Sequence, residues 1–478
     1  MIRRLLNSVF ETVSSAEPLN YYNPFTRKET IPFGWLTDVA PCFPVNANSI
    51  KIITDPDTFY KTLLDGCSFA KERITLVSLY LGNGNLEEKL VNSVKDNEYF
   101  RSNKLNVRVL LDYTRGSRFE YNSRVMLQPL LLQNNQNCRV SLYHTPELRG
   151  LLKKYMPNRW NELLGLQHMK LYIFDDKLII SGANLSNDYF TNRQDRYFVI
   201  DDKPLCDFYC GLIDQVQKFS LQMDKNNKVQ LHSNWKLSPY EGNKREFVTQ
   251  AGDIIEQYFV DVMNSQNVHK QEGFDTWIFP LIQIGQLGVE QDAQITDRIF
   301  AEAPDGGKLK IATGYFNLTN QYMNTLILRC RAHCDILMAH PKANGFYGAK
   351  GPAGGIPYAY SLIAKEFKEK YSKKGQQHRI KLFEYLRSGW TYHAKGLWYY
   401  QPGEELPSLT LIGSPNFGHR SVSKDLESQL AIIAENEDLR KSLHEECSNL
   451  YELASPAETE RRIPAWVYAY VTLFRSYF

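Results

Sequence analysis

Short apolar runs, separated by amphipathic stretches, recur along the whole chain. In the first part of the chain, strands are predicted by the runs at 74–81, 107–112, 139–143 and 178–180, and a helical pattern begins at residue 86. In the second part, strands are predicted at 309–316, 335–338, 379–383 and 409–412, and 320–331 has a helical pattern. Strands that alternate with helices predict an α/β fold with mostly parallel sheets and right-handed crossovers.

The two sets of predicted strands follow the same order, which indicates a duplicated fold. The predicted divisions are an N-terminal targeting or membrane-proximal segment (1–40), a first half (41–225), a polar connection (226–250), a second half (251–455) and a C-terminal aromatic and basic segment (456–478). Apolar residues at helical spacing beside Arg3 and Arg4 leave two interpretations of the N-terminal segment open, a short targeting helix or an ordinary first helix.

The composition is that of a folded protein with little net charge. A chain of 478 residues can bury a large core, and its 43% hydrophobic and 23% charged residues argue against disorder. The formal net charge of +3 argues against a nucleic-acid partner. The sequence has no run of about 18 consecutive apolar residues, so no membrane span is predicted. The eight cysteines include no C-x-x-C pair, so we expect buried thiols rather than a zinc site.

Two copies of one polar pattern are the strongest functional signal. His168-x-Lys170 is followed by a small-residue turn that ends at Asn184, and Asp195 lies eleven positions further on. The second copy has the same order, with His393, Lys395, the turn residue Ser414, then Asn416 and Glu427, again eleven positions apart. Matching copies in the two halves predict that the halves pack as a pseudo-dimer with one shared active site.

Residues at positions i and i+2 of a strand point to the same face, so each histidine is expected beside its lysine. Two imidazoles and two ammonium groups in one cleft would form a strongly cationic pocket, which suits a phosphodiester or pyrophosphate substrate. The amides of Asn184 and Asn416 would donate to the non-bridging oxygens. One histidine can attack phosphorus while the other transfers protons. Asp195 and Glu427 are candidates to orient the imidazoles, and no metal is required.

These residues resemble the phospholipase D superfamily, whose hallmark is a duplicated H-x-K-x4-D motif followed by a G-S-x-N-type turn. His168, Lys170 and Asp175 match the first copy, whereas Tyr400 occupies the position of the aspartate in the second. Asp175 is thus a catalytic candidate by resemblance. Its place between two apolar runs also fits a hairpin turn, which would make it structural.

Longer stretches resemble one branch of that superfamily, the eukaryotic phosphatidylglycerophosphate synthases. The matching segments are 111–118, 181–186, 189–196, 344–351, 389–396, 413–418 and 425–427. The resemblance implies two phospholipase D-like halves and transfer of a phosphatidyl group from CDP-diacylglycerol to sn-glycerol 3-phosphate without a cofactor. It also implies a mitochondrial enzyme at the matrix face of the inner membrane, on the route to cardiolipin. It makes His168 the nucleophile, which leaves His393 as the general base for the acceptor.

The acceptor's phosphate requires cationic or hydrogen-bonding partners. The candidates are Arg115, Arg118, Arg193, Arg196 and Ser414, with surface ion pairing as the alternative for the arginines. The lipid substrate requires contact with a membrane surface, for which anionic lipid is expected. Residues 466–474 are aromatic and flanked by basic residues, which fits either an interfacial segment or a C-terminal helix docked on the core. The sequence leaves the oligomeric state open.

Three alternatives to this function stay open. The first is another enzyme of the superfamily that uses a different alcohol, such as serine, or that releases the lipid to water as a phospholipase. The second is a nucleic-acid phosphodiesterase, which the low net charge disfavours. The third is a non-catalytic lipid-binding scaffold, which the departure at Tyr400 suggests.

Overall fold

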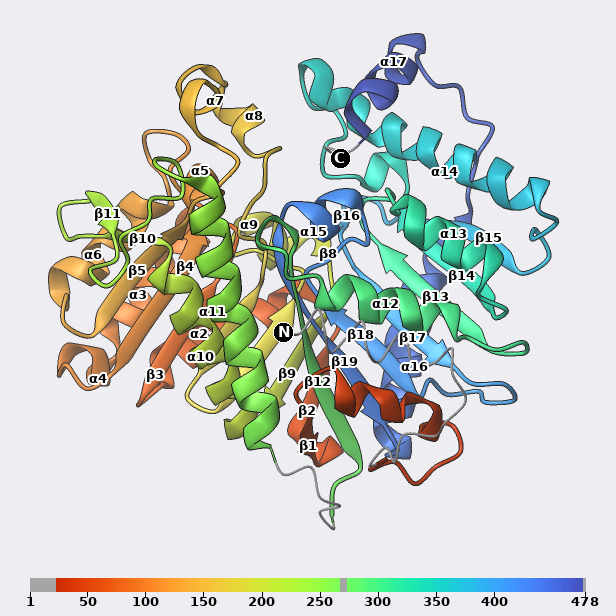
Figure 1. Cartoon of the computed structure of the whole chain (residues 1–478), viewed down its shortest axis with the longest axis horizontal. Helices are drawn as coiled ribbons and strands as arrows, with labels where there is room; N and C mark the ends of the chain where they lie inside the picture. Colours follow the sequence, from red (N-terminus) through yellow and green to blue (C-terminus); the bar gives the residue numbers. More distant parts are fainter. Residues whose placement is uncertain (1–22, 267–272, 476–478) are drawn as a thin grey trace.

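Two large sheets, flanked by helices, form the body of the protein (Figure 1). The computed structural model describes residues 23–266 and 273–475. Residues 1–22, on which the targeting prediction rests, lie outside the described residues. No helix among the described residues has both the length and the apolar character needed to cross a bilayer.

The first sheet has nine strands in the order β11-β10-β5-β4-β3-β6-β7-β9-β2. Their bounds are β2 (Ile50–Ile53), β3 (Arg73–Val77), β4 (Asn106–Asp112), β5 (Cys138–Tyr143), β6 (Leu171–Phe174), β7 (Lys177–Ser181), β9 (Tyr197–Asp201), β10 (Leu221–Met223) and β11 (Val229–Leu231). Helices α2 (Pro56–Phe69), α3 (Asn85–Asp96) and α6 (Ser123–Gln133) cover one face, where their apolar residues form a cluster with β3, β4 and β6.

The second sheet has the order β1-β12-β19-β18-β17-β13-β14-β15-β20. Its strands are β1 (Phe43–Val45), β12 (Thr276–Ile284), β13 (Lys308–Thr313), β14 (His333–Ala339), β15 (Ile380–Tyr385), β17 (Gly396–Tyr400), β18 (Leu409–Gly413), β19 (Leu426–Ala434) and β20 (Ala454–Pro456). The principal helices of this half are α12 (Gln291–Ala301), α13 (Asn320–Leu328), α14 (Ile356–Lys373), α16 (Glu437–Glu452) and α17 (Ala465–Phe474).

The two sheets repeat one topology, which confirms the predicted duplication. The run β5-β4-β3-β6-β7-β9-β2 in the first sheet corresponds to β15-β14-β13-β17-β18-β19-β12 in the second. The larger apolar cluster contains residues of both halves, including Ile180 and Leu212 from the first and Leu281 and Ile412 from the second. The halves therefore share one core.

The fold class is α/β as predicted, but the sheets are mixed rather than mostly parallel. Among the described residues of these two large sheets, parallel pairs occur only between β3, β4 and β5 in the first and between β13, β14 and β15 in the second. The strand after each motif runs antiparallel to its neighbour β3 or β13 and pairs antiparallel with the next strand. In the first half this is the geometric result of the two-residue turn at Asp175 and Asp176, because a turn of that length joins only antiparallel strands.

The described part of the N-terminal segment belongs to the folded core of the second half. β1 pairs antiparallel with β12, although residues 43–45 precede every strand of the first sheet. The carboxylate of Glu435 accepts hydrogen bonds from the backbone of Thr26 and Arg27 and from the Thr30 hydroxyl. Residues 23–45 therefore pack on the second half, and the predicted boundary at residue 41 does not correspond to a change of sheet.

The predicted connection 226–250 is only partly a linker. β11 belongs to the first sheet, and α11 (Lys244–Ser265), which begins within this stretch, packs against α10 (Lys203–Lys218). Asn243 caps α11 by accepting hydrogen bonds from the backbone of Arg245 and Glu246. All eight cysteines are buried free thiols, as predicted.

Candidate active site

Both His-x-Lys motifs lie immediately before a strand rather than within one. β6 begins at Leu171 and β17 begins at Gly396, one residue after the motif lysine in each half. The prediction that the motif residues share a strand face is therefore wrong. The motif segments do not join their own sheets because their backbones pair with the other half.

This pairing is the same on both sides of the site. The His168 amide donates to the Leu426 carbonyl at 2.8 Å, and the His393 amide donates to the Gln194 carbonyl at 2.8 Å. Both are parallel contacts, one an isolated bridge and the other the small sheet formed by β8 (Arg193–Gln194) and β16 (Thr391–Tyr392). Each motif thus lies beside the residue that precedes the other half's carboxylate.

The two histidines take their carboxylates from opposite halves. Nδ1 of His168 lies 2.9 Å from both oxygens of Glu427, and Nδ1 of His393 lies 2.7 Å from Oδ2 of Asp195. With Nδ1–H donated to a carboxylate, Nε2 carries the lone pair that can attack phosphorus or accept a proton. Neither half can build this arrangement alone, so the site requires both.

The two motif lysines lie buried beside their histidines. Nζ of Lys170 donates to the His168 carbonyl at 2.6 Å, and Nζ of Lys395 donates to the His393 carbonyl at 2.8 Å. Asp195 lies 3.9 Å from the Lys395 ammonium. Two lysines and two carboxylates balance formally, so the predicted strongly cationic pocket is wrong for this innermost cluster. The balance is what allows four charged groups to stay buried together.

Burial shifts the pKa values of the titratable groups in the cluster. It holds the pKa of both histidines well below the ordinary imidazole value, and the neighbouring Lys170 and Lys395 act in the same direction. It raises the pKa of Asp195 to about 6 against the opposing charge of Lys395, and it raises the pKa of Glu427. It lowers the pKa of Lys395 to about 8. Neutral imidazoles near pH 7 are competent as nucleophile and general base.

Each of the two turn asparagines has a side-chain oxygen with unused hydrogen-bonding capacity. Asn184 and Asn416 occupy equivalent places after β7 and β18, and Oδ1 of each is buried without a hydrogen-bond partner among the described residues. A buried amide that makes no hydrogen bond to protein is costly unless a ligand supplies one. The unpartnered atoms are acceptors, so they do not test the predicted donation by these amides to phosphoryl oxygens, which stays a prediction.

The surroundings of the two histidines differ. No described residue hydrogen-bonds to Nε2 of His168, whose side chain is 12% exposed. Nε2 of His393 lies 3.4 Å from the hydroxyl of Tyr189, and its side chain is 3% exposed. The rings of Tyr189 and Tyr315 pack edge-on against His393 at 5.1 and 5.4 Å. These tyrosines were not predicted, and their aromatic type alone carries no signal for the site.

Two ion pairs flank the cluster with their charges exchanged. Arg193 pairs with Asp188 at 3.0 Å in the first half, and Arg420 pairs with Asp425 at 3.2 Å in the second. Measured from the turn asparagine of each half, Asp188 and Arg420 occupy the same position, and so do Arg193 and Asp425. Arg420 was missed from the sequence, although the matched spacing of five residues in both halves is a signal that would have identified it.

Two of the other predicted arginines, Arg115 and Arg118, lie in the neighbourhood of the site. Arg115 and Arg118 both contact Glu162, at 3.7 and 2.9 Å, and are partly exposed. They lie in and just after α5 (Tyr113–Gly116), which follows the last strand residue, Asp112. The carboxyl of Asp112 accepts from the amide of Gln167, the residue before His168, so these arginines belong to the neighbourhood of the site.

Arg196 is a structural residue, so its prediction as a phosphate clamp is wrong. Its guanidinium is 1% exposed and binds both oxygens of Glu446 at 2.8 Å. Its remaining donors reach Thr410 and the carbonyl of Leu411, and its plane lies 3.9 Å over the ring of Trp398. Every donor direction is occupied within the protein, which leaves none for a ligand.

Ser414 is also removed from substrate. It is fully buried, and its hydroxyl lies 3.2 Å from both the amide and the carbonyl of Ser428. Ser181 makes the equivalent bond to the Arg196 carbonyl in the first half. The two serines hold the turns that carry the asparagines, so the prediction of substrate contact by Ser414 is wrong.

Asp175 lies at the opposite end of β6 from the motif lysine. It has a positive φ of 52°, and its carboxylate accepts from the amides of Lys71, Glu72 and Arg73. The structure therefore separates Asp175 from the catalytic cluster and gives it the turn role. Its counterpart Tyr400 is buried at the end of β17 with its hydroxyl 3.3 Å from His444. The departure in the second motif consequently falls outside the cluster.

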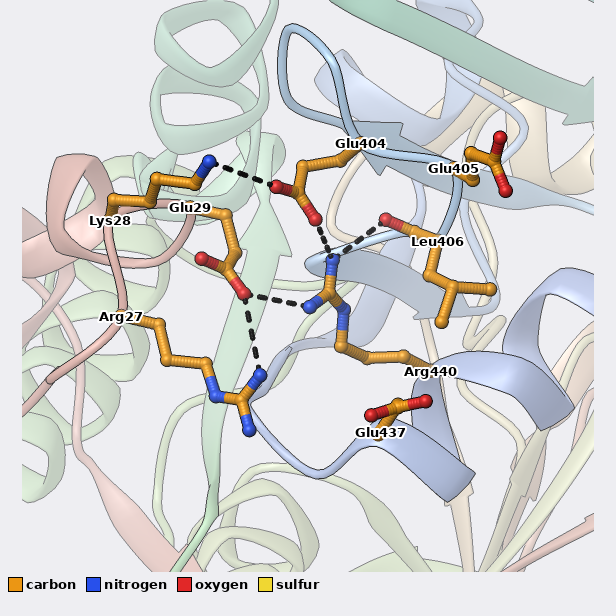
Figure 2. A pocket seen from close by; sticks show the side chains of 8 residues that line it. All are labelled: Arg27, Lys28, Glu29, Glu404, Glu405, Leu406, Glu437 and Arg440. Carbon is orange, nitrogen blue, oxygen red and sulfur yellow. Dashed lines mark hydrogen bonds and ion pairs between the residues drawn. The ribbon is translucent and has the colours of Figure 1, made fainter.

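Two other groups of polar residues could be mistaken for a site. A cavity of about 590 Å³ on the second half is lined by ion pairs in which Arg440 binds Glu29 at 2.7 Å and Glu404 at 2.9 Å (Figure 2). Arg27, Lys28 and Arg440 pair with Glu29 and Glu404 within the lining, and the catalytic cluster contributes no residue to it. His168, Asp425 and Glu427 could together hold a metal ion, but each already has the partner described above.

Comparisons with known proteins identify the relatives of the chain. No family model matches the chain. It is 42% identical to the protein of Gallus gallus named mitochondrial CDP-diacylglycerol–glycerol-3-phosphate 3-phosphatidyltransferase, over 93% of this chain and 86% of that one. The Homo sapiens protein of the same name has the same identity and coverage. The Saccharomyces cerevisiae protein named CDP-diacylglycerol–glycerol-3-phosphate 3-phosphatidyltransferase is 33% identical over 94% of this chain and 90% of its own length.

A solved structure shares the fold. The chain matches the phosphatidylserine synthase of Haemophilus influenzae with a TM-score of 0.70 and 21% identity, over 94% of this chain and 97% of that one. The match extends through both sheets and confirms a phospholipase D-like fold. At this identity the likeness concerns the fold alone.

Proposed function

The chain belongs to the family of CDP-diacylglycerol–glycerol-3-phosphate 3-phosphatidyltransferases, and from that premise we propose how its paired histidines carry out the reaction. The protein transfers the phosphatidyl group of CDP-diacylglycerol to sn-glycerol 3-phosphate and releases CMP. The observation that supports a two-step mechanism is the pair of imidazoles, each held at Nδ1 by the other half's carboxylate. Such a pair suits two consecutive displacements at one phosphorus.

In the first step, Nε2 of His168 attacks the phosphorus that carries the diacylglycerol. A P–N bond forms, the P–O bond to CMP breaks, and CMP leaves with the electron pair. CMP is already a stable phosphate anion, so this step needs little proton donation. His168 is the better nucleophile of the two because its Nε2 has no partner among the described residues and its side chain is the more exposed.

In the second step, a hydroxyl of glycerol 3-phosphate attacks the phosphatidyl-histidine. A P–O bond forms, the P–N bond breaks, and the hydroxyl proton passes to Nε2 of His393. An unactivated alcohol needs this general base, and the lowered pKa of His393 keeps it neutral and able to accept the proton. Asp195 then stabilises the imidazolium that forms, since it lies 2.7 Å from Nδ1.

The remaining residues bind the reacting groups. Lys170, Lys395, Asn184 and Asn416 would hold the oxygens of the transferring phosphoryl group, where negative charge develops. The acceptor's own phosphate would lie against Arg115, Arg118 and Arg193, whose present partners Glu162 and Asp188 it would displace. Water must be kept from the phosphatidyl-histidine, and the tyrosines packed on His393 reduce its access.

The lipid substrate places the protein at a membrane surface, with anionic lipid as the favoured contact. The vertebrate relatives are named mitochondrial. We infer peripheral association with the matrix face of the inner mitochondrial membrane. The aromatic helix α17 is the contact predicted from the sequence, and three of its large side chains are exposed in the structure.

An acceptor panel tests the function. Purified protein in mixed micelles receives CDP-diacylglycerol with glycerol 3-phosphate, serine, glycerol or no acceptor, and CMP release and lipid products are measured. Phosphatidylglycerophosphate formed with glycerol 3-phosphate, and lost in His168→Ala, is the expected result. Phosphatidylserine would indicate a serine acceptor, and phosphatidic acid under every condition would indicate a phospholipase. No CMP under any condition would contradict the assignment as a transferase.

A further inference from the structure

Large apolar side chains gather on one short segment of the first half. Leu151, Leu152 and Tyr155 of α7 (Gly150–Tyr155) are 75%, 48% and 70% exposed, and Trp160 of α8 (Asn158–Asn161) is 42% exposed. The three α7 side chains fall on one side of the helix, within an arc of about 100°. Single exposed apolar residues are ordinary on a soluble protein, but a cluster of this kind marks an interaction surface.

The second half presents an apolar element of its own. α17 has no charged residue from Ala465 to Phe474, and Val467 and Val471 bury one side of it against α14. On its other sides, Trp466, Tyr468 and Leu473 are exposed. A helix that is apolar on its outer as well as its inner side is normally covered on both.

These two elements form one continuous surface. The rings of Trp160 in α8 and Phe474 in α17 contact each other, with their centroids 6.0 Å apart. In Figure 1, α7, α8 and α17 all lie at the top of the molecule, above the site elements α9 (Asn187–Thr191), β8 and β16. The surface therefore joins the two halves at the end of the molecule where the site's loops lie.

The surface is connected to the catalytic cluster on both sides. Two residues after Trp160, Glu162 binds Arg118, and the chain then runs directly to His168. On the other side, α17 packs on α14, whose Tyr360 stacks on Tyr315, the residue packed against His393. The apolar elements are thus next to the groups that would bind the substrate's phosphates.

The charge of the first element favours anionic lipid. Residues 149–161 contain four basic residues, Arg149, Lys153, Lys154 and Arg159, and no acidic residue, and Lys154 is exposed. Aromatic and aliphatic side chains beside lysines have the composition of an element that lies in a membrane interface. A soluble protein partner or a second copy of this chain would not need the excess of positive charge.

We propose that α7–α8 and α17 are two membrane-docking arms, one from each half, that insert into an anionic bilayer around the active site. This inference rests on the proposed function, because only a lipid substrate requires the site to adjoin a bilayer. The glycerol backbone alone separates the reacting phosphorus from the acyl esters. With both arms inserted, the acyl chains stay in the bilayer while the diphosphate reaches His168.

Vesicle binding of the full chain is the first test. Leu151→Asp/Leu152→Asp alters the first arm and Leu473→Asp the second, and Leu132→Asp on α6 is the matched control, since Leu132 is 63% exposed but stands alone on its helix. On phosphatidylcholine vesicles that contain phosphatidylglycerol, each arm variant is expected to bind at least about tenfold more weakly than wild type. The control is expected to bind like wild type, and Lys153→Gln/Lys154→Gln is expected to lose the preference for anionic over pure phosphatidylcholine vesicles.

Activity with two forms of substrate separates docking from catalysis. The arm variants are expected to lose activity on CDP-diacylglycerol in vesicles by about tenfold or more, in step with binding. They are expected to retain wild-type activity, within about twofold, on a short-chain CDP-diacylglycerol below its micelle concentration, because that substrate needs no membrane. If the wild-type protein turns over neither form, the proposed function fails, which is a different outcome from failure of the arms.

Two results would overturn the proposal. Unchanged vesicle binding in the α7 double variant would show that α7 does not dock on the bilayer. A wild-type protein that sediments as a dimer without lipid, and as a monomer after Leu151→Asp/Leu152→Asp, would show that a second copy covers this surface instead.

Discussion

Nδ1 of His168 lies 2.9 Å from both carboxylate oxygens of Glu427, a residue 259 positions away in the other half of the chain. The contact follows from the backbone, because the amide of His168 donates to the carbonyl of Leu426 and so places the next side chain opposite the imidazole. Asp195 and His393 repeat the relationship with the halves exchanged. The active site is therefore a product of how the halves pack.

Because each histidine is held by the carboxylate of the other half, replacement of one carboxylate should slow one of the two chemical steps more than the other. Glu427→Gln should slow formation of the phosphatidyl-histidine, and Asp195→Asn should slow its transfer to the acceptor, because each amide disturbs the tautomer of one imidazole. We expect kcat to fall by about 10³-fold in each. Rapid-quench measurement of CMP should show a retained burst in Asp195→Asn and no burst in Glu427→Gln. Equal loss of the burst in both would contradict the division of labour.

The pH dependence of kcat/KM should be bell-shaped. Asp195 must be ionised to orient His393, and burial raises its pKa to about 6, so activity should fall as the pH drops through 6. Both histidines stay neutral to lower pH because burial lowers their pKa values. Lys395 must be charged to bind phosphoryl oxygens, and burial lowers its pKa to about 8, so activity should also fall as the pH rises through 8.

Replacement of the lysine checks the alkaline limb. Lys395→Arg keeps the charge at every accessible pH, so the part of the limb near pH 8 that belongs to Lys395 should disappear from its profile, and only the loss due to Lys170, whose pKa burial also lowers, should remain. A profile in which the limb near pH 8 is unchanged in Lys395→Arg would assign that limb to another group.

Arg193 is expected to affect the KM for glycerol 3-phosphate but not the KM for glycerol, because only the first acceptor has a phosphate. Arg193→Gln is expected to raise the KM for glycerol 3-phosphate by about tenfold or more, since a hydrogen bond to a charged group is worth roughly 1.5–3 kcal/mol. The KM for glycerol, which has no phosphate, should not change. Arg108→Gln is the matched control, because Arg108 pairs with Asp214 on α10. A tenfold effect on both acceptors would mean that Arg193 supports the fold or the chemistry instead.

Arg196 should affect stability without affecting substrate recognition. Arg196→Met leaves Glu446 buried without its partner, and we expect the free energy of unfolding to fall by roughly 3–5 kcal/mol in urea titrations. Arg196→Met/Glu446→Leu should recover part of that loss, because no unpaired charge remains. The KM for glycerol 3-phosphate in the folded double variant should match wild type. A raised KM would show instead that Arg196 binds the phosphate of the acceptor.

Much of the fold was predictable because its strands are buried and short. The runs at 107–112 and 409–412 coincide with β4 and β18 within a residue, since buried strands consist of uninterrupted apolar residues. The direction of the strands after each motif was not predictable in the same way. An apolar run has no direction, and only the two-residue turn at Asp175 indicated an antiparallel pair.

The candidate site, like the fold, was predictable from the sequence only in part. The repeated spacing identified both histidines, both lysines, both asparagines and both carboxylates, and the structure brings the histidines, lysines and carboxylates together. The spacing could not say which carboxylate serves which histidine, because that depends on backbone contacts between halves. Arg196 was misassigned because a sequence does not distinguish an arginine that meets solvent from one that is buried against Glu446.

The two-step mechanism depends on a covalent intermediate on His168, and that intermediate can be trapped. Wild-type protein is mixed with CDP-diacylglycerol without acceptor, denatured within milliseconds under alkaline conditions that preserve phosphohistidine, and digested for mass spectrometry. We expect a phosphatidyl adduct on the peptide that contains His168, which accumulates in step with the CMP burst and disappears when glycerol 3-phosphate is added. An adduct on the His393 peptide would exchange the roles of the histidines. CMP released only with acceptor, and no adduct on either peptide, would contradict the two-step mechanism in favour of direct transfer.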